Sequence, residues 1–248
     1  ALTCEKLNKH EKAIKYYQLL VSYKYGGAKI YSFMINVHKR TKDDTARLEI
    51  LNEGRIAYPD DNNLIIEELN YYIESGDKTK AITNLESAIE KDGDNYNLYY
   101  ALGSMYDQVG DFKNGESSYK RALELAEPAY TQSLEGYKSS MGTEDESASK
   151  ANVDKVHNTY FSILYNYGAL YFNEGVKEIQ KTSTISNNSV YAREKERAEN
   201  QMLLALPFLE KALELKPEDK NTLTSLKDLY ARVGDNEKWQ RIQEKLEN

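Results

Sequence analysis

The sequence predicts an all-α protein made of stacked helical hairpins, and three observations lead to this fold class. Four Pro and 13 Gly are few for 248 residues, and Lys, Glu, Ala and Leu recur throughout, a composition that favours helices. Apolar residues return three and four positions apart, as they do on one face of a helix. Equivalent residues also return every 34 positions, so that Gly76-Asp77 is followed by Gly110-Asp111. A fixed period of this length indicates a repeat architecture.

The 34-residue period defines a partial repeat at 1–27 and three complete repeats at 28–61, 62–95 and 96–129. Each repeat contains two amphipathic helical segments joined by a turn. In the repeat at 96–129, Gly110 is expected to end the first helix, because glycine adopts the left-handed conformation of a helix terminus. Asp111 is the expected N-cap of the second helix. Small residues at positions 103, 115 and 122 let the two helices approach closely.

This repeat resembles the tetratricopeptide repeat (TPR) family, which has aromatic, small and proline residues at fixed offsets. The matching residues are Tyr99, Leu102, Gly103, Tyr106, Gly110, Gly115, Tyr119 and Ala122, with the family's proline displaced by one to Pro128. The repeat at 28–61 departs most, since Ile35, His38 and Arg47 replace small or aromatic residues. The resemblance implies a right-handed α-solenoid that serves as a non-catalytic scaffold or adaptor, with a peptide or partner protein bound in its concave groove.

The pattern returns with interruptions in the C-terminal part of the chain. An interrupted repeat is predicted at 161–219, where Gly168 and Ala212 occupy repeat positions. A last repeat follows at 220–248, with Gly234-Asp235 at its turn. Charged residues dominate its second helix, which predicts a polar cap of the kind that repeat arrays need for solubility. We therefore expect a single solenoid over residues 1–248.

The first insertion into the period lies at 130–160. Apolar residues with helical spacing stand on both sides of an acidic, Ser-containing turn at 142–147. We expect an extended helix pair, with one helix prolonged toward Ser140 and the next starting near Ala151. A disordered loop is the alternative that the composition of the turn allows.

The second insertion is an extended helical hairpin at 176–198, with a turn by composition at 182–189. Pro207 is expected to bend or break the returning helix, because proline removes one hydrogen bond and clashes one turn back. The hairpin and the segment after it resemble exported TPR proteins of Bacteroidetes-type bacteria. This resemblance implies a periplasmic or exported location, and a cytoplasmic one stays open. Because the sequence has no initiator Met, we expect its natural N-terminus to be missing.

Composition and charge exclude several classes of protein. The mean hydropathy is −0.75, and no stretch approaches the roughly 20 apolar residues of a membrane helix. One Cys excludes a disulfide within the chain. Residues 1–42 carry a net charge of +7, which leaves −14 for the rest, and an acidic body repels the phosphates of nucleic acids. The basic end either steers an acidic partner or a membrane surface, or forms the solvated faces of two helices.

Catalytic and metal-binding residue types are present but form no motif. His10, His38 and His157 lie outside every metal-binding pattern, and neither a phosphate-binding loop nor a nucleophile motif occurs. Carboxylates are dispersed rather than paired. We therefore predict that the protein is no enzyme and has no cofactor or metal. His38 and Cys4 stand 34 positions apart in the repeat, and both are expected to be buried and inert.

In the TPR family, the fifth and ninth positions of each repeat face the concave groove. The resemblance therefore implies groove contacts by Asn36, Asn70, Tyr100, Ser104, Tyr165 and Asp228. An Asn amide both donates and accepts hydrogen bonds, which suits a peptide backbone, and Tyr offers a rigid amphipathic surface. The alternative is that these residues are merely solvated. Three other residues near repeat starts are predicted helix N-caps, namely Asn63, Asn97 and Asn221.

Some TPR domains grip a C-terminal carboxylate with Lys at the fifth position of a repeat. Here Ser32, Ile66 and Tyr100 occupy these positions, so this clamp is not predicted. The partner is thus expected to be a protein or peptide of unknown identity. A self-associating structural protein and a targeting or regulatory fragment of a larger chain are the alternative functions.

Overall fold

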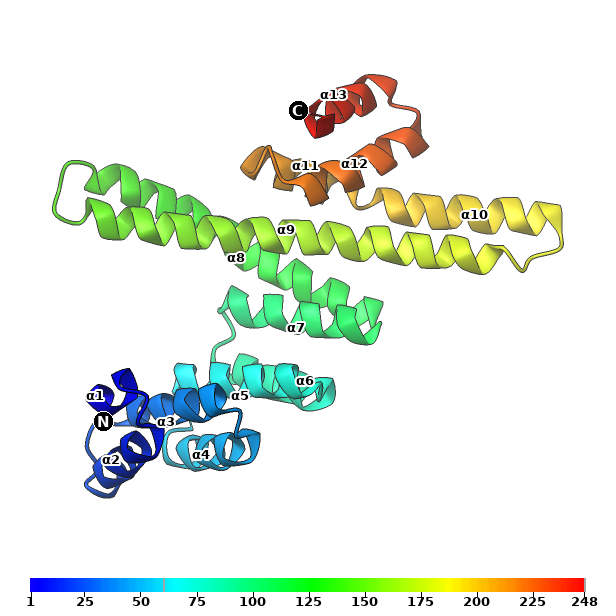
Figure 1. The fold of residues 1–248 in the computed structure, drawn as a ribbon. Helices are drawn as coiled ribbons and strands as arrows, with labels where there is room; N and C mark the ends of the chain where they lie inside the picture. Colours follow the sequence, from blue (N-terminus) through cyan, green and yellow to red (C-terminus); the bar gives the residue numbers. More distant parts are fainter. Residues whose placement is uncertain (60, 248) are drawn as a thin grey trace. The chain divides into compact units, whose positions relative to one another are not determined.

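Helices form the whole of the architecture in the computed structural model, which describes residues 1–59 and 61–247 and has no strand among them (Figure 1). The chain divides into two compact units, unit 1 (Ala1–Lys91) and unit 2 (Asp92–Asn248), which we describe one at a time. The all-α fold class is confirmed. The expectation of a single continuous solenoid stays a prediction.

Unit 1 contains three helical hairpins. They are α1 (Leu2–Lys6) with α2 (His10–Ser22), α3 (Ala28–Thr41) with α4 (Asp44–Ala57), and α5 (Asn62–Ser75) with α6 (Lys78–Lys91). The complete hairpins begin at residues 28 and 62, as the period predicts. Their core includes Met34 and Ile35 of α3 and Leu51 of α4, together with Ala13 and Tyr17 of α2.

Unit 2 keeps the same register at its start and then departs from it. It contains α7 (Tyr96–Val109), α8 (Phe112–Ser140), α9 (Glu146–Thr182), α10 (Asn188–Leu203), α11 (Leu206–Leu215), α12 (Lys220–Val233) and α13 (Asn236–Glu247). In Figure 1, the end of α8 lies along the first part of α9 and α10 lies along its last part. Rings of Tyr130 and Tyr160 stack at 5.3 Å between centroids and join α8 to α9. The 37-residue α9 is thus shared by two hairpins.

The predicted turn chemistry is confirmed at most repeat junctions. Gly76, Gly110 and Gly234 end their helices in the left-handed conformation, with φ between 70° and 77°. The carboxylate of Asp111 accepts a hydrogen bond from the Asn114 amide at 3.2 Å, as an N-cap does. These side chains satisfy backbone groups that a helix end leaves without partners.

The N-caps predicted at the starts of first helices were wrong by two residues. Asp61, Asn95 and Asp219 cap these helices, and Asn63, Asn97 and Asn221 lie within the first turn. The oxygen of Asn95 accepts from the amide of Asn97 at 3.1 Å. The residue before the helix holds the accepting oxygen, because only from there does it reach the free N–H groups of the first turn.

The first insertion is the predicted extended helix pair, and its link is shorter than expected. α8 reaches Ser140, and α9 begins at Glu146 rather than near Ala151. Gly142 turns the chain with φ 79°, and its amide donates to the Glu146 carboxylate at 2.8 Å. Acidic side chains are favourable at a helix N-terminus, which explains why the acidic segment starts the helix. α8 also continues through Pro128, because Tyr130 packs on α9 beyond it.

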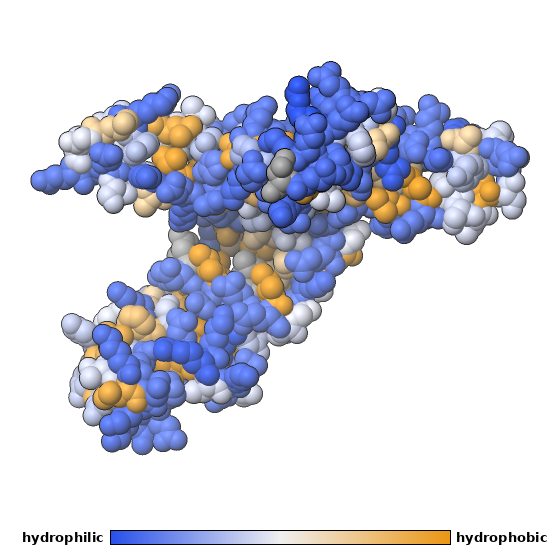
Figure 2. All heavy atoms as spheres, turned by 45° about the horizontal axis from the view of Figure 1, so that its top comes forward, coloured by the Kyte–Doolittle hydropathy of each residue, from blue (hydrophilic) through white to orange (hydrophobic). Residues whose placement is uncertain are grey.

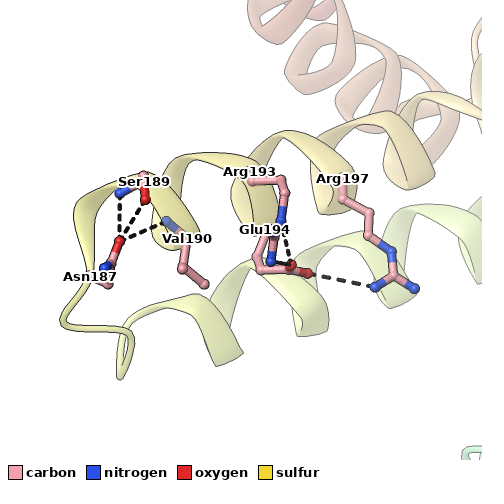
Figure 3. A network of polar contacts seen from close by, with 6 residues as sticks. All are labelled: Asn187, Ser189, Val190, Arg193, Glu194 and Arg197. Carbon is pink, nitrogen blue, oxygen red and sulfur yellow. Dashed lines mark hydrogen bonds and ion pairs between the residues drawn. The ribbon is translucent and has the colours of Figure 1, made fainter.

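The second insertion is a helical hairpin between α9 and α10, as predicted. Asn187 caps α10 and accepts hydrogen bonds from the amides of Ser189 and Val190 at 3.0 and 3.1 Å (Figure 3). The returning helix breaks after Leu203, and Pro207 lies in the first turn of α11. This position tolerates proline because its missing N–H would have no partner there. The effect expected of Pro207 is confirmed.

Burial confirms the prediction for His38 and corrects the one for Cys4. The His38 side chain is buried, whereas Cys4 is only half-buried. α1 has five residues, none of them fully buried, so its side chains stay partly accessible. At the other end of the chain, α13 buries Ile242 and exposes its charged residues, as expected of a polar helix. Figure 2 shows a largely hydrophilic surface with apolar residues in scattered patches.

Close contact between helices in unit 2 depends on glycines of α7 and α9. A Cβ atom added to Gly103 would lie 2.7 Å from the ring of Tyr119, and one added to Gly168 would lie 2.7 Å from Leu209. At Gly175 the obstacle is backbone, since the Cα of Met202 would be 2.8 Å away. The predicted role of small residues in close approach is therefore confirmed at Gly103.

We predict that Gly175→Ala lowers the free energy of unfolding by about 1–3 kcal/mol, because α10 must move away from α9. Gly136→Ala is the matched control, since Gly136 lies in α8 with nothing within 4 Å of an added Cβ. The control should be stabilised by about 0.5–1 kcal/mol, because glycine is unfavourable inside a helix. Urea unfolding followed by circular dichroism measures both. Equal stability of the two variants would contradict the close packing described.

Candidate interaction surface

Tyr100 joins two of the first helices of unit 2. It lies on α7, and its hydroxyl accepts a hydrogen bond from the Asn166 amide of α9 at 2.8 Å. Burial raises the pKa of Tyr100, while hydrogen bonds from Ser162 and Asn166 act in the opposite direction. Its ring lies 6.2 Å from that of Tyr119, between centroids. The tyrosine is thus held in one orientation, half-buried, with its hydroxyl engaged by α9.

Tyr165 extends this arrangement toward α12. It lies on α9 beside Asn166, half-buried, and its ring stacks on Phe161 at 6.2 Å and 13°. Burial raises the pKa of Tyr165, and the negative charge of Asp219, the N-cap of α12, adds to this effect. Tyr165 therefore lies between the middle of α9 and the start of α12. The structure brings Tyr100 and Tyr165 onto neighbouring first helices.

Ser104 and Asp228 are the two other predicted groove contacts of unit 2. Ser104 lies one turn after Tyr100 on α7 and is half-buried, with its hydroxyl 3.5 Å from the Gln108 amide. Asp228 is exposed on α12. Both residues lie on first helices, as the repeat register requires. Their part in binding stays a prediction.

In unit 1, the predicted contacts Asn36 and Asn70 lie on α3 and α5. Asn36 is exposed and donates to the Ser32 carbonyl at 2.9 Å, and Asn70 is half-buried. Lys39 of α3 and Glu74 of α5 form an ion pair at 2.6 Å about one turn further along each helix. α3 and α5 are thus connected next to the two asparagines. Asn36 and Asn70 belong to unit 1, whereas Tyr100 and Tyr165 belong to unit 2.

Beneath this ion pair lies a buried arginine that the repeat pattern did not anticipate. Arg47 of α4 is 2 % exposed and occupies the position that holds Ala81 in the next repeat. Its guanidinium donates to the second oxygen of Glu74 and lies over the ring of Tyr71 at 5.3 Å. One oxygen of the Glu74 carboxylate therefore neutralises the buried guanidinium of Arg47, and the other oxygen pairs with Lys39. The departure of Arg47 from the TPR pattern was the sequence signal that marked this place.

A cleft of about 360 Å³ lies along the hairpin of α9 and α10, and sequence reasoning did not find it. Glu174, Glu178 and Lys181 of α9 line it, with Glu194 and Arg197 of α10 opposite. The carboxylates are paired with cations: Glu178 with Lys181 at 2.5 Å and Glu194 with Arg197 at 3.6 Å (Figure 3). The lining is mixed in charge, so it offers no free pair of carboxylates for acid–base chemistry.

Among residues 1–59 and 61–247, no group of three His, Cys, Asp or Glu is placed to hold a metal ion. None of the helices in that part of the chain combines the length and apolarity needed to cross a bilayer.

Comparison with known proteins supports the repeat architecture. A tetratricopeptide-repeat model matches residues 1–25 and 96–128. The crystal structure of the MamA protein is similar over 88 % of this chain and 89 % of its own, with a TM-score of 0.57 and 15 % identity. BtubC (BKLC) from P. vanneervenii is similar over 98 % and 89 %, with a TM-score of 0.59 and 16 % identity. None of the curated proteins compared with the chain matches it significantly.

The fold is that of a TPR solenoid. The predicted family resemblance is confirmed for the repeat pattern, and the implied origin among exported Bacteroidetes-type proteins stays a prediction. The TPR fold is typically a non-catalytic interaction module, and it supports a scaffold with protein or peptide partners.

The pairing of Glu74 with Arg47 and Lys39 predicts that the Glu74 carboxylate stabilises the fold in a pH-dependent way. Hydrogen bonding from Lys39 lowers the pKa of Glu74 below its usual 4.5, against the effect of burial, and Arg47 adds to the lowering. A carboxyl whose pKa is lower in the folded state stabilises the fold above the unfolded pKa, and this contribution is lost as the pH falls below it. Glu74→Gln should therefore lower the free energy of unfolding at pH 7 by about 1 kcal/mol, a modest value because Glu74 is 43 % exposed.

Urea unfolding at pH 7 and at about pH 3.5, below the usual Glu pKa, measures this difference. Glu90→Gln is the matched control, because Glu90 is exposed on α6. The control should change stability by less than about 0.5 kcal/mol. If Glu74→Gln lowered the free energy of unfolding equally at both pH values, the ionised carboxylate would not be the stabilising group.

Proposed function

We propose that the protein is a non-catalytic interaction scaffold that binds an extended peptide or a segment of a partner protein across the first helices α7, α9 and α12. The observation that carries the proposal is the hydrogen bond that connects Tyr100 of α7 to Asn166 of α9. It fixes one tyrosine beside a second, Tyr165, which lies toward α12. Two rigid aromatic side chains on adjacent helices are the kind of anchor that dominates the binding energy of protein interfaces.

The polar residues of this surface supply the second part of peptide recognition. Ser104 and Asp228 lie on the same first helices and offer a hydroxyl and a carboxylate. Asn36 and Asn70 belong to unit 1 and are not part of this surface; in that unit their amides can each donate and accept hydrogen bonds. A peptide backbone presents N–H and C=O groups regularly, so such side chains bind it with little dependence on sequence. Aromatic anchors then select the apolar side chains of the bound segment.

A non-catalytic role agrees with the chemistry of the described side chains. His38 is buried. The Nδ1 atom of His157 lies 3.2 Å from the Tyr130 hydroxyl, within hydrogen-bond distance. The carboxylates of the α9–α10 cleft are neutralised by Lys and Arg. A general acid or base needs a proton-exchanging group that faces a bound substrate. The histidines and carboxylates named here therefore serve packing and ion pairs.

Selection of peptides from a displayed random library, followed by fluorescence anisotropy of the recovered peptides, tests the proposal. Tyr165→Ala should weaken binding at least about tenfold, the loss expected when an interface anchor is truncated. Tyr191→Ala is the matched control, because Tyr191 is 38 % exposed on α10, away from α7 and α12. Its affinity should stay within about twofold. Peptides that lose affinity equally in both variants would contradict binding at the first helices.

A further inference from the structure

A second surface with binding chemistry lies on the first hairpin of unit 1. Tyr16 and Leu19 of α2 and Tyr23, the residue directly after it, are 51 %, 49 % and 74 % exposed. Spacings of three and four residues place them on one side of the helix. The other side of α2 packs inward, with Ala13 and Tyr17 buried and the Tyr17 ring stacked on Phe33 of α3 at 5.6 Å. α2 is therefore apolar on two sides, and one of them is covered.

α1 also exposes apolar side chains. Leu2 and Leu7, at either end of this short helix, are 54 % and 60 % exposed. We call the surface formed by Leu2, Leu7, Tyr16, Leu19 and Tyr23 the α1–α2 face. By contrast, α13 directs Ile242 inward and exposes its charged residues. Among the residues whose exposure the structure describes, five of the eight exposed leucines and tyrosines thus lie on the α1–α2 face.

Five exposed lysines stand in the same stretch of sequence as the α1–α2 face, namely Lys6, Lys9, Lys12, Lys15 and Lys24. None of the five forms an ion pair within residues 1–59 and 61–247. Lys12 precedes Tyr16 by one helical turn and so lies on the same side of α2. Glu5, one of two acidic residues among residues 1–24, is engaged by Arg40 and by the Tyr17 hydroxyl. The five lysines outnumber Glu11, the one exposed carboxylate among residues 1–24, so the α1–α2 face combines exposed apolar side chains with an excess of positive charge.

We propose that the α1–α2 face binds an acidic amphipathic helix of a partner protein. A straight stripe on a helix is matched by a second helix, whose apolar side chains pack between those of the stripe. Carboxylates beside the apolar residues of that partner would reach these five lysines and speed the encounter. This site is separate from the surface of α7, α9 and α12, and the inference does not rest on the function proposed for it.

Charge also argues against a second copy of this chain as the occupant. In a twofold-symmetric dimer the same face meets itself. Five lysines would then oppose five lysines, with unfavourable energy at low salt. An acidic helix instead gains both apolar burial and charge neutralisation. The excess of positive charge thus favours a partner of opposite charge over self-association.

Fluorescence anisotropy with two labelled helical peptides of 18 residues tests the inference on the 248-residue chain. Both probes carry leucines at positions i, i+3, i+4 and i+7, and they differ only in flanking residues, Glu in one and Lys in the other. The Glu probe should bind at least about tenfold more tightly than the Lys probe, and the difference should shrink between about 0.05 and 0.5 M salt, as screening predicts.

Variants assign the binding to the α1–α2 face. Leu19→Ser with Tyr23→Ser should weaken the Glu probe at least about tenfold. Ile56→Ser is the control, since Ile56 is 84 % exposed on α4 in the same unit. Lys12→Glu with Lys15→Glu should reverse the preference toward the Lys probe, whereas Lys113→Glu with Lys120→Glu on α8 should not. Circular dichroism verifies that each variant is folded.

Three results would overturn the inference. Equal affinity for the two probes, or no affinity for either, would exclude recognition of an acidic helix. A concentration-dependent dimer in light scattering that Leu19→Ser abolishes would assign the face to a second copy. Binding of vesicles containing anionic lipid, lost in Lys12→Glu with Lys15→Glu while the Glu probe fails to bind, would assign it to a membrane surface. Peptides selected for the α7–α9–α12 surface should be unaffected by all α1–α2 variants.

Discussion

The close contact of α9 with the helices on either side of it is the constraint on which unit 2 depends. A helix of 37 residues is about 55 Å long, and its stability in water comes from packing rather than from propensity alone. Gly168 and Gly175 remove the side chains that would hold α10 and α11 away. The rings of Tyr167 and Tyr171 then pack with Phe208, at 4.2 and 5.9 Å between centroids. The same helix presents Tyr165 and Asn166, so the geometry of the candidate interaction surface follows from this packing.

Local signals in the sequence were sufficient to predict the helices and most of their ends. The period of 34 placed the starts of α3, α5 and α7. An Asp or Asn caps α5 and α7 and a Gly ends each of them, whereas α3 follows Gly27 and has Lys42 at its C-terminal cap. Pro207 marked the break between α10 and α11, since its missing N–H is tolerated only in the first turn. The start of α9 was placed too late because Glu146, which begins it, stands in a segment with the composition of a loop.

Contacts between distant residues could not be predicted in this way. Arg47 and Glu74 are 27 residues apart, and Tyr100 and Asn166 are 66 apart across the first insertion. No rule of spacing joins such pairs, because their distance depends on how insertions redirect the helices. The sequence therefore identified Tyr100 as a surface residue from its repeat position. The structure adds that Asn166 of α9 donates a hydrogen bond to the Tyr100 hydroxyl.

Charge is distributed so that the two proposed surfaces select different partners. Residues 1–91 contain 14 Lys or Arg and 14 Asp or Glu, so the net charge of −7 belongs to residues 92–248. The positive charge of residues 1–42 divides further, because Lys39 and Arg40 are neutralised by Glu74 and Glu5. The lysines that remain include Lys6, Lys9, Lys12, Lys15 and Lys24 of the first hairpin. An acidic helix is thus attracted to α1 and α2 and repelled by unit 2, whereas a neutral or basic peptide meets no such barrier at α7, α9 and α12.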